Sequence, residues 1–287
     1  MKLNNEELRK ILPDNGPSLE EVQKYITKYT NDLIVIKYGG NVFIDRNLFN
    51  NFISDLSVLK QLGLSIVVVH GGGPRIKREL DKSNIQSKFI RGLRVTDKKI
   101  INVVENVLID FNIDIVDSLK EKGTEAISIN TKKNNIIEVI PESEELGFVG
   151  KPSKINSDII KNILAKNVIP IISPLGVGKN NQTYNINGDT AAGAIAKSLK
   201  SRRLILMTNI NGVLDKEKKL IEEITSSEIL KMINDEIITE GMIPKINTCL
   251  DAVNNGVTGV VIVDGRKPHS ILFEIFSDKG AGTLIRK

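Results

Sequence analysis

The sequence has few of the features that mark secreted, membrane-spanning or nucleic-acid-binding proteins. Its 287 residues include one cysteine, Cys249, so no internal disulfide can form, which fits a reducing cytoplasm. No apolar run approaches the roughly 20 residues that cross a bilayer, and the charged first segment lacks the apolar core of a signal peptide. Aromatic residues make up only 4% of the chain and form no stacking cluster. We therefore expect a soluble, cytoplasmic protein with no membrane and no nucleic-acid partner.

The charge balance is slightly basic. The chain has 40 lysines and arginines against 35 aspartates and glutamates, a formal net charge of +5. A surplus this small can help to attract anionic ligands, but it falls short of the basic patch that marks a nucleic-acid-binding domain.

Strand-like and helix-like patterns alternate along the chain. Residues 32–40 ("DLIVIKYGG") and 64–73 ("LSIVVVHGGG") read as buried strands, and residues 48–63 between them read as a helix. A strand–helix–strand unit is typical of a parallel sheet, and the alternation continues without repeats or low-complexity linkers. We therefore predict an α/β fold, an open three-layer αβα sandwich with a central, mostly parallel sheet. One or two amphipathic helices are expected before it, within residues 1–30.

Four glycine-bearing segments follow predicted strands. They are residues 37–41 ("KYGGN"), 70–74 ("HGGGP"), 185–189 ("NINGD") and 208–214 ("TNINGVL"). Because the carboxyl ends of parallel strands share one edge of a sheet, we expect these segments to meet there. A tight turn is the commoner role of a single glycine after a strand. Four such segments on one edge favour a binding site instead.

The segment "HGGGP" suits an anion. Glycines let backbone N–H groups approach a ligand, and a helix N-terminus adds about half a positive charge. Pro74 fits the first turn of a helix, where its missing N–H costs nothing. Gly71 to Gly73 are therefore candidates to hold a phosphate or a carboxylate.

Two standard nucleotide-binding motifs are missing. The Walker pattern GxxxxGK[ST] does not occur, so the chain is not an ordinary P-loop NTPase. The segment "HGGGPR" lacks the third glycine of the dinucleotide fingerprint GxGxxG, which argues against an NAD-dependent oxidoreductase.

Four charged residues lie in or near these segments, and two of them have two possible roles each. Lys37 ends an apolar strand and either reaches the surface or faces an anion. Lys245, in "EGMIPKIN", is a candidate anion ligand or an exposed helical lysine. Asp189 follows Gly188 at a helix start, where its plain role is an N-cap. Arg94, in "GLRVTD", could clamp a carboxylate through two parallel hydrogen bonds.

Six strings together resemble the amino acid kinase family. In that family's order, the chain contains "VIKYGGN", "VVVHGGGP", "GLRVTD", "YNINGD", "LMTNINGVL" and "GMIPKI", and the resemblance extends from about Thr30 to the end. "GLRVT" followed by "YNIN" favours the branch with an N-acetyl-L-glutamate acceptor over the uridylate, carbamate and aspartate branches. The resemblance implies transfer of the γ-phosphoryl of ATP, with Mg²⁺, to the side-chain carboxylate of N-acetyl-L-glutamate. The product would be N-acetyl-L-glutamyl 5-phosphate, in arginine biosynthesis.

The resemblance also implies roles for individual residues. The catalytic residues would be Lys37, Lys245 and Asp189, with Asp189 holding the two lysines in place. The acceptor would be bound by Gly72, Gly73, Arg94 and Asn185, with Arg94 on its α-carboxylate. ATP would lie beside Gly39, Gly40, Thr208, Asn209, Gly212 and Gly241. No dedicated metal ligand from the protein is expected.

The resemblance divides the chain into an N-terminal helical extension (1–30), an acceptor-binding and dimerisation lobe (31–184) and an ATP-binding lobe (185–287), without a linker. The N-terminal helix and residues 269–285 ("HSILFEIFSDKGAGTLI") look like the arginine-inhibited, hexameric branch of the family. L-arginine would contact Tyr25, Arg203, His269, Glu274 and Gly280. We expect a homo-oligomer, either a dimer or a hexamer. The alternative role of these two segments is a capping helix and a buried C-terminal strand.

Several positions depart from the family pattern. Gly188 stands where alanine is usual, Asn209 where aspartate is common, and Arg203 where a lysine is expected; an arginine and a lysine differ in geometry. Other departures are Ile113, Thr124, Ser128 and Thr131. Two alternative functions remain open, a kinase for a related amino-acid carboxylate and a non-catalytic arginine sensor. Retention of Lys37, Asp189 and Lys245 favours an enzyme over a sensor.

Overall fold

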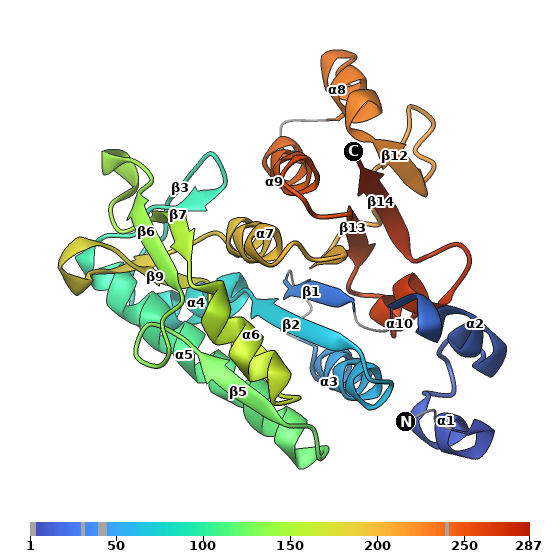
Figure 1. The fold of residues 1–287 in the computed structure, drawn as a ribbon. Helices are drawn as coiled ribbons and strands as arrows, with labels where there is room; N and C mark the ends of the chain where they lie inside the picture. The colour runs from blue at the N-terminus through green and yellow to red at the C-terminus, as the bar shows by residue number, and fades with distance from the viewer. Residues whose placement is uncertain (1–3, 30–31, 40–44, 239–240) are drawn as a thin grey trace.

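Helices cover both faces of a large, twisted sheet (Figure 1). The computed structural model describes residues 4–29, 32–39, 45–238 and 241–287. Within these residues the sheet has eight strands, in the order β12 (Glu223–Thr225), β14 (Gly282–Arg286), β13 (Gly259–Asp264), β11 (Arg203–Thr208), β1 (Leu33–Tyr38), β2 (Ser65–His70), β8 (Ile169–Ile172) and β5 (Ala126–Ile129). The strands from β13 to β5 are mutually parallel, whereas β14 is antiparallel to β13. The predicted mostly parallel sheet is therefore confirmed.

The alternation of side chains along the central strands creates two cores. In β1, Ile34, Ile36 and Tyr38 join the core on one face of the sheet, and Val35 joins the core on the other. The first face is covered by α1 (Asn5–Ile11), α2 (Leu19–Tyr29), α3 (Arg46–Gln61), α5 (Lys98–Glu121) and α10 (Ser270–Phe276). The second is covered by α6 (Ser157–Ala165), α7 (Gly188–Leu199), α8 (Ser226–Asn234) and α9 (Ile243–Asn254). The predicted three-layer αβα sandwich is confirmed.

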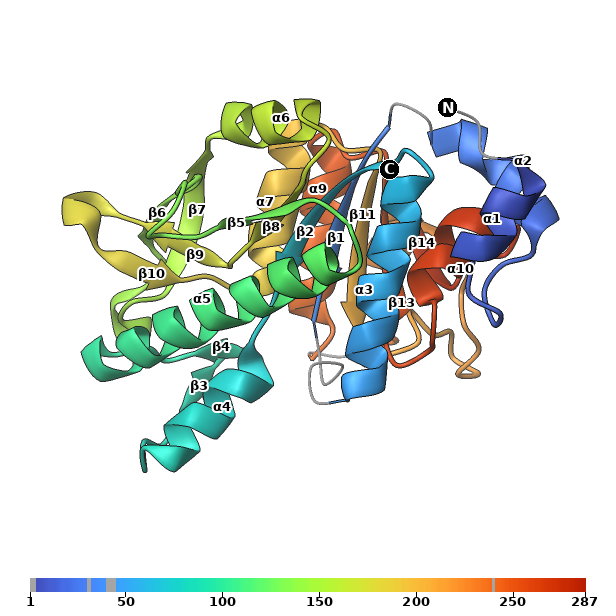
Figure 2. The same ribbon diagram turned by 90° about the horizontal axis from the view of Figure 1, so that it is seen from below.

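A smaller sheet lies at the end of the molecule opposite the N-terminal helices (Figure 2). Its strands are β10 (Thr183–Asn185), β9 (Leu175–Val177), β6 (Ile137–Pro141) and β7 (Gly150–Ile155), in that order. Near it, β3 (Phe89–Ile90) and β4 (Leu93–Arg94) form a hairpin, and α4 (Gly73–Lys82) packs along α5. The segment 185–189 follows β10, which pairs antiparallel with β9. The expectation that all four glycine segments follow strands of one parallel sheet is wrong for this segment.

The N-terminal extension consists of two helices that dock on α10. Leu8 of α1, Val22 of α2 and the buried residues of α10 belong to one hydrophobic core. Both views place α2 beside α10 (Figures 1 and 2). None of the helices in the described part of the chain combines the length and the apolar character that a membrane span needs.

Candidate active site

One carboxylate lies between two lysines, near the carboxyl end of β1 in the middle of the large sheet. Lys37 follows Val35 by two positions, so its side chain emerges on the face of the sheet that α7 covers. Its Nζ lies 2.9 Å from Oδ1 of Asp189 in the first turn of α7. Lys245, in the first turn of α9, donates a hydrogen bond to Oδ2 of the same carboxylate. Packing of α7 against α9 and β1 therefore assembles the three residues predicted to be catalytic.

The cluster is buried and carries an excess of positive charge. Burial alone would raise the pKa of Asp189, but the charges of Lys37 and Lys245 and their hydrogen bonds outweigh it and hold that pKa well below its usual range. Burial lowers the pKa of Lys37, and Lys245 adds to the lowering while Asp189 opposes it. Two cations against one anion leave a positive charge unmatched in a desolvated place, which favours an anionic ligand.

The N-cap of α7 is Asn187 and not Asp189, so the plainer of the two roles considered for Asp189 does not apply. The Oδ1 atom of Asn187 accepts from the backbone N–H groups of Asp189 (2.9 Å) and Thr190 (3.2 Å). Asparagine caps a helix as well as aspartate does. Because Asn187 satisfies these N–H groups, both oxygens of Asp189 are left to face the lysines.

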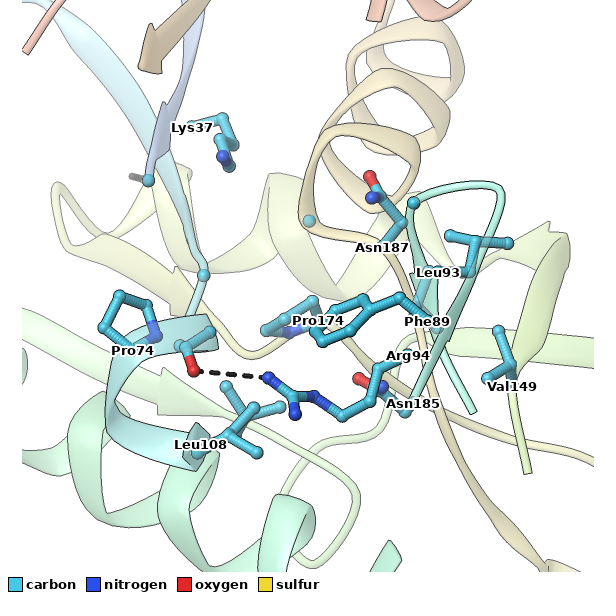
Figure 3. A pocket seen from close by; sticks show the side chains of 18 residues that line it. Lys37, Pro74, Phe89, Leu93, Arg94, Leu108, Val149, Pro174, Asn185 and Asn187 are labelled. Atoms are coloured by element: carbon cyan, nitrogen blue, oxygen red, sulfur yellow. Dashed lines mark hydrogen bonds between the residues drawn. The ribbon is translucent and has the colours of Figure 1, made fainter. Parts of the chain in front are cut away.

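A cavity of about 280 Å³ opens beside Lys37. Figure 3 shows Lys37 and Arg94 reaching toward it from different elements. Its polar border comprises Gly71, Gly72, Gly73, Asn185, Asn187 and Gly188, and its apolar walls include Phe89, Leu108, Val149 and Pro174. The N-termini of α4 and α7 both lie on this border, and each adds partial positive charge. The cavity is therefore suited to a small, partly apolar anion.

Arg94 is the main cation at the far side of this cavity. Its side chain is largely buried and is held by a hydrogen bond to Ser87 Oγ, by another to the Gly73 carbonyl oxygen at 3.4 Å, and by the Phe89 ring at 4.7 Å (Figure 3). None of these three partners carries a negative charge. A buried guanidinium held by neutral groups is ready to pair with a carboxylate from a ligand.

Gly39 allows the chain to pass close to Lys37. A Cβ atom at position 39 would lie 1.8 Å from Lys37 Nζ, so any larger residue would displace the lysine head. Gly39 also borders the first cavity. The predicted ATP contact of Gly40 lies outside the described residues.

Two further cavities contain residues predicted to bind ATP. One, of about 370 Å³, is bordered by Asp189, Lys245 and Gly241, and it shares Asn187 and Val149 with the first cavity. The other, also of about 370 Å³, lies beside the loop after β11 and includes Asn209, Gly212, Ile237, Met242 and Arg266. Thr208 ends β11 next to that loop, with its Oγ1 3.4 Å from Asn209 Oδ1. The predicted acceptor residues thus border the first cavity, Gly241 borders the second, and Asn209 and Gly212 border the third.

The residues predicted to bind arginine are mostly gathered elsewhere. Tyr25, Arg203, Glu274 and Gly280 border a separate cavity of about 190 Å³ between α2 and the α10–β14 segment. Lys28 also borders it, a residue that the sequence analysis did not single out. His269 does not line this cavity, because its Nδ1 lies 2.6 Å from Oδ1 of the buried Asp55 in α3.

Sequence reasoning missed the N-cap of α7 and the apolar walls of the first cavity. A signal for Asn187 existed, because asparagine two positions before the first acidic residue of a helix is a common cap. Phe89, Leu108 and Pro174 come from three elements distant in sequence, and their apolar character alone carries no sign of a ligand.

The chain matches the model of the amino acid kinase family over residues 32–264. A protein named acetylglutamate kinase from Pelagibacter ubique is 55% identical over 285 residues, which cover 99% of both chains. Another of that name, from Clostridioides difficile, is 46% identical, with 96% of this chain and 98% of the relative covered.

Among solved structures, an N-acetylglutamate synthase from Neisseria gonorrhoeae, complexed with coenzyme A and N-acetyl-glutamate, has a TM-score of 0.84 at 22% identity over 93% of this chain. The match spans 62% of the synthase chain, so that likeness concerns the fold of a part of it. Family model, relatives and fold agree, and the chain belongs to the amino acid kinase family.

Proposed function

We infer that the chain is an enzyme that moves the γ-phosphoryl of ATP to the side-chain carboxylate of N-acetyl-L-glutamate. The product is N-acetyl-L-glutamyl 5-phosphate, an intermediate of arginine biosynthesis. The observation that carries this inference is the buried Lys37–Asp189–Lys245 cluster beside an anion-suited cavity. It stands in a chain 55% identical to a protein named acetylglutamate kinase.

The cluster supplies what this reaction needs. A carboxylate acceptor is ionised at pH 7, so no general base is required. The difficulty is to bring two anions together and to stabilise charge spread over the transferring phosphoryl group. In our proposal Lys37 stabilises that group and Lys245 approaches it from the nucleotide side. Asp189 positions both ammonium groups without taking up a proton.

The first cavity is our proposed acceptor site. Arg94 pairs with the α-carboxylate of N-acetyl-L-glutamate, Asn185 and the N–H group of Gly73 bind its polar atoms, and Gly72 lies beside its reacting carboxylate. The apolar walls contact its methylene and acetyl groups, which is consistent with an acylated rather than a free amino acid. We assign this role mainly to the lobe formed by residues 31–184, with Asn185 at the start of the second lobe completing the site.

The second and third cavities are our proposed ATP site, to which the lobe formed by residues 185–287 contributes Asp189, Lys245 and the whole third cavity. We propose that Gly241 lies beside the phosphates and that Gly39 approaches their γ end from the first cavity, whereas Thr208, Asn209 and Gly212 lie beside the nucleoside. The apolar side chains of Ile237 and Met242 support this assignment, because a nucleobase stacks on such surfaces.

Mg²⁺ fits this site as a companion of ATP. Within the described residues no group of three or more histidine, cysteine or acidic side chains gathers to hold a metal ion. Mg²⁺ commonly keeps its waters and binds through substrate phosphates, where it neutralises charge. We therefore propose that the ATP phosphates carry the ion.

We also propose that L-arginine inhibits the enzyme from the cavity between α2 and α10. Its border combines the cations Lys28 and Arg203 with the carboxylate of Glu274, as a ligand with both a carboxylate and a guanidinium requires. The Nε of Arg203 is buried and has no hydrogen-bond partner among the residues that the structure describes. The resemblance of the N-terminal helices to the hexameric branch supports a homo-oligomer, which light scattering with and without arginine would test. The single cysteine, Cys249, supports a cytoplasmic location.

The experiment is a coupled assay of ADP release from ATP and Mg²⁺ with a panel of acceptors. The panel contains N-acetyl-L-glutamate, L-glutamate, L-aspartate and carbamate. We expect turnover with N-acetyl-L-glutamate and little with the others. Faster turnover of another carboxylate would replace the proposed acceptor, and arginine binding without any turnover would favour a sensor.

A further inference from the structure

His70 lies directly before the three glycines and has no place in the mechanism described so far. It ends β2 opposite Tyr38, and its side chain is fully buried on the face of the sheet that α5 covers. Its Nδ1 lies 2.7 Å from the Gly71 carbonyl oxygen, and its Nε2 lies 3.1 Å from Asn112 Nδ2 in α5. The Phe111 ring packs edge-on against the imidazole, with 5.1 Å between ring centroids.

The partners of His70 define which nitrogen carries its proton. A carbonyl oxygen can only accept a hydrogen bond, so Nδ1 is the protonated nitrogen and donates to Gly71. Asn112 Nδ2 donates one hydrogen to the Ile171 carbonyl at 2.9 Å and the other to Nε2 of His70. Burial lowers the pKa of His70 to about 4, so the ring is neutral at physiological pH. Both ring nitrogens are satisfied by this single neutral form.

The bond from His70 sets the direction of the next peptide group. In a trans peptide the C=O and the following N–H point to opposite sides. The bond that turns the Gly71 carbonyl toward His70 therefore turns the Gly72 N–H away from α5. Gly71 is fixed at its other end by donation of its N–H to the Tyr38 carbonyl at 2.8 Å. Lys37 emerges on the side opposite His70, and it borders the same cavity as Gly71 and Gly72.

We propose that His70 is a positioning residue that holds the Gly71–Gly72 peptide so that the Gly72 N–H donates to the phosphoryl group in transit. Asn112 positions His70 in turn, by holding its Nε2 from α5. The proposal rests on the proposed phosphoryl transfer, but it does not depend on which carboxylate is the acceptor. A fixed backbone donor of this kind needs no reorganisation when charge develops in the transition state.

Three substitutions separate the orienting role from simple packing. In H70N the side-chain amide nitrogen can occupy the place of Nδ1 and donate to Gly71. H70Q retains a polar group near the place of Nε2 for Asn112, but it removes the donor to Gly71, and H70L removes both. Loss of one oriented donor typically costs about 10²–10³-fold in kcat. We expect losses of that order in H70Q and H70L, little change in KM for ATP, and retention of most activity in H70N. Equal losses in H70N and H70L, with unchanged thermal unfolding, would overturn the proposal.

A binding measurement tests the same claim without an acceptor. ADP, Mg²⁺ and aluminium fluoride mimic the transferring phosphoryl, and calorimetry gives their affinity. We expect about tenfold or more weaker binding of this complex to H70L and H70Q than to wild type and H70N, while MgADP alone binds all four alike. If wild type fails to turn over N-acetyl-L-glutamate and this difference persists, the acceptor assignment fails and the role of His70 stands. Equal affinities in all four proteins would show that His70 does not position the donor.

Discussion

The carboxylate of Asp189 lies 2.9 Å from the ammonium group of Lys37, and both side chains are largely buried. Two local rules bring them together. Side-chain alternation in β1 sends Lys37 to the face of the sheet covered by α7, and the cap formed by Asn187 leaves the Asp189 side chain unused by its own helix. With Lys245 on the other carboxylate oxygen, the site has a fixed geometry and an excess positive charge before any substrate arrives.

The pH dependence of activity reports on Lys37. Burial lowers its pKa below the ordinary value of 10.5, and its ammonium form is the active one. Activity should therefore fall as pH rises through this lowered pKa, so the alkaline limb of the kcat profile lies below pH 10.5. Asp189 stays ionised throughout the accessible range and adds no acid limb. In K37R the guanidinium stays charged, so kcat should be lower but the limb should move to higher pH. An alkaline limb that is unchanged in K37R would assign the titration to another group.

Arg94 should control the affinity for the acceptor. R94K keeps the charge but loses the planar fork and the contact with Phe89, so KM for N-acetyl-L-glutamate should rise by about 10–100-fold. KM for ATP should change little, because Arg94 borders the first cavity and not the other two. Arg78, an exposed residue of α4 that borders none of the three cavities, provides the control, as R78K. A parallel rise in both KM values of R94K would argue against a direct contact with the acceptor.

Glu274 should govern the response to arginine. Its carboxylate borders the cavity beside α2 and accepts the Ala281 N–H at 2.9 Å. E274Q removes the charge that pairs with a guanidinium, so arginine should bind about 10–100-fold more weakly by calorimetry. Glu20, an exposed residue of α2 that does not border the cavity, is the control as E20Q. Equal weakening in both variants would point to a general field effect rather than a specific contact.

Gly280 supports the same cavity through its backbone. Its φ of +67° is a conformation that favours glycine, and a Cβ atom there would lie 2.7 Å from Glu274 Oε2. G280A should therefore weaken arginine binding in the same direction as E274Q. Calorimetry on G280A checks this, and wild-type affinity would contradict the proposed place of arginine.

The Asp55–His269 pair should make folding stability depend on pH. Burial raises the pKa of Asp55 to about 6, although His269 opposes this, and the hydrogen bond that His269 donates to Asp55 raises the pKa of His269. Both groups hold their protons more tightly in the folded chain than in the unfolded one. The stability that Asp55 contributes is therefore lost as pH rises from 3.8, its ordinary pKa, to about 6. The stability that His269 contributes is lost as pH rises above 6.5, the ordinary pKa of histidine.

The test of this pair is a comparison of wild type with the neutral double variant D55N/H269Q. Denaturant unfolding at several pH values from 4 to 8 gives both free energies of unfolding. We expect the free energy of unfolding of wild type to fall by about 1–3 kcal/mol relative to that of the double variant as pH rises over this range. Parallel stability curves would show that the pair does not titrate in this range.

Local sequence patterns predicted features that depend on neighbouring residues, such as a strand, a glycine-rich turn and a helix start. The apolar run before Lys37 predicted a central strand, and the glycines after it and after His70 predicted close approach to an anion. A helix start was predicted beside Gly188 and Asp189, and α7 begins at Gly188. The sequence left Asp189 as a possible cap although the cap is Asn187, since the capping energies of these residue types are too similar to separate by type alone.

Contacts between distant segments could not be predicted in the same way. His269 and Asp55 are 214 positions apart, and no local sequence pattern predicts that they pair. The position of "NINGD" after a strand of the smaller sheet also depends on how β9 and β10 pair, which a short, partly polar strand does not reveal. The proposed roles of Arg94 in acceptor binding and of Glu274 in arginine binding come from the family resemblance, because the neighbouring residues alone do not specify a ligand.

The most direct test of the account is the formation of the acyl phosphate itself. ATP, Mg²⁺, N-acetyl-L-glutamate and hydroxylamine are incubated with wild type, K37A and K231A, and the trapped hydroxamate is measured. Lys231 is an exposed residue of α8 and serves as the matched control. We predict hydroxamate from wild type and K231A, and about 10²–10³-fold less from K37A. No hydroxamate from wild type, or an undiminished rate in K37A, would contradict phosphoryl transfer at the Lys37–Asp189–Lys245 cluster.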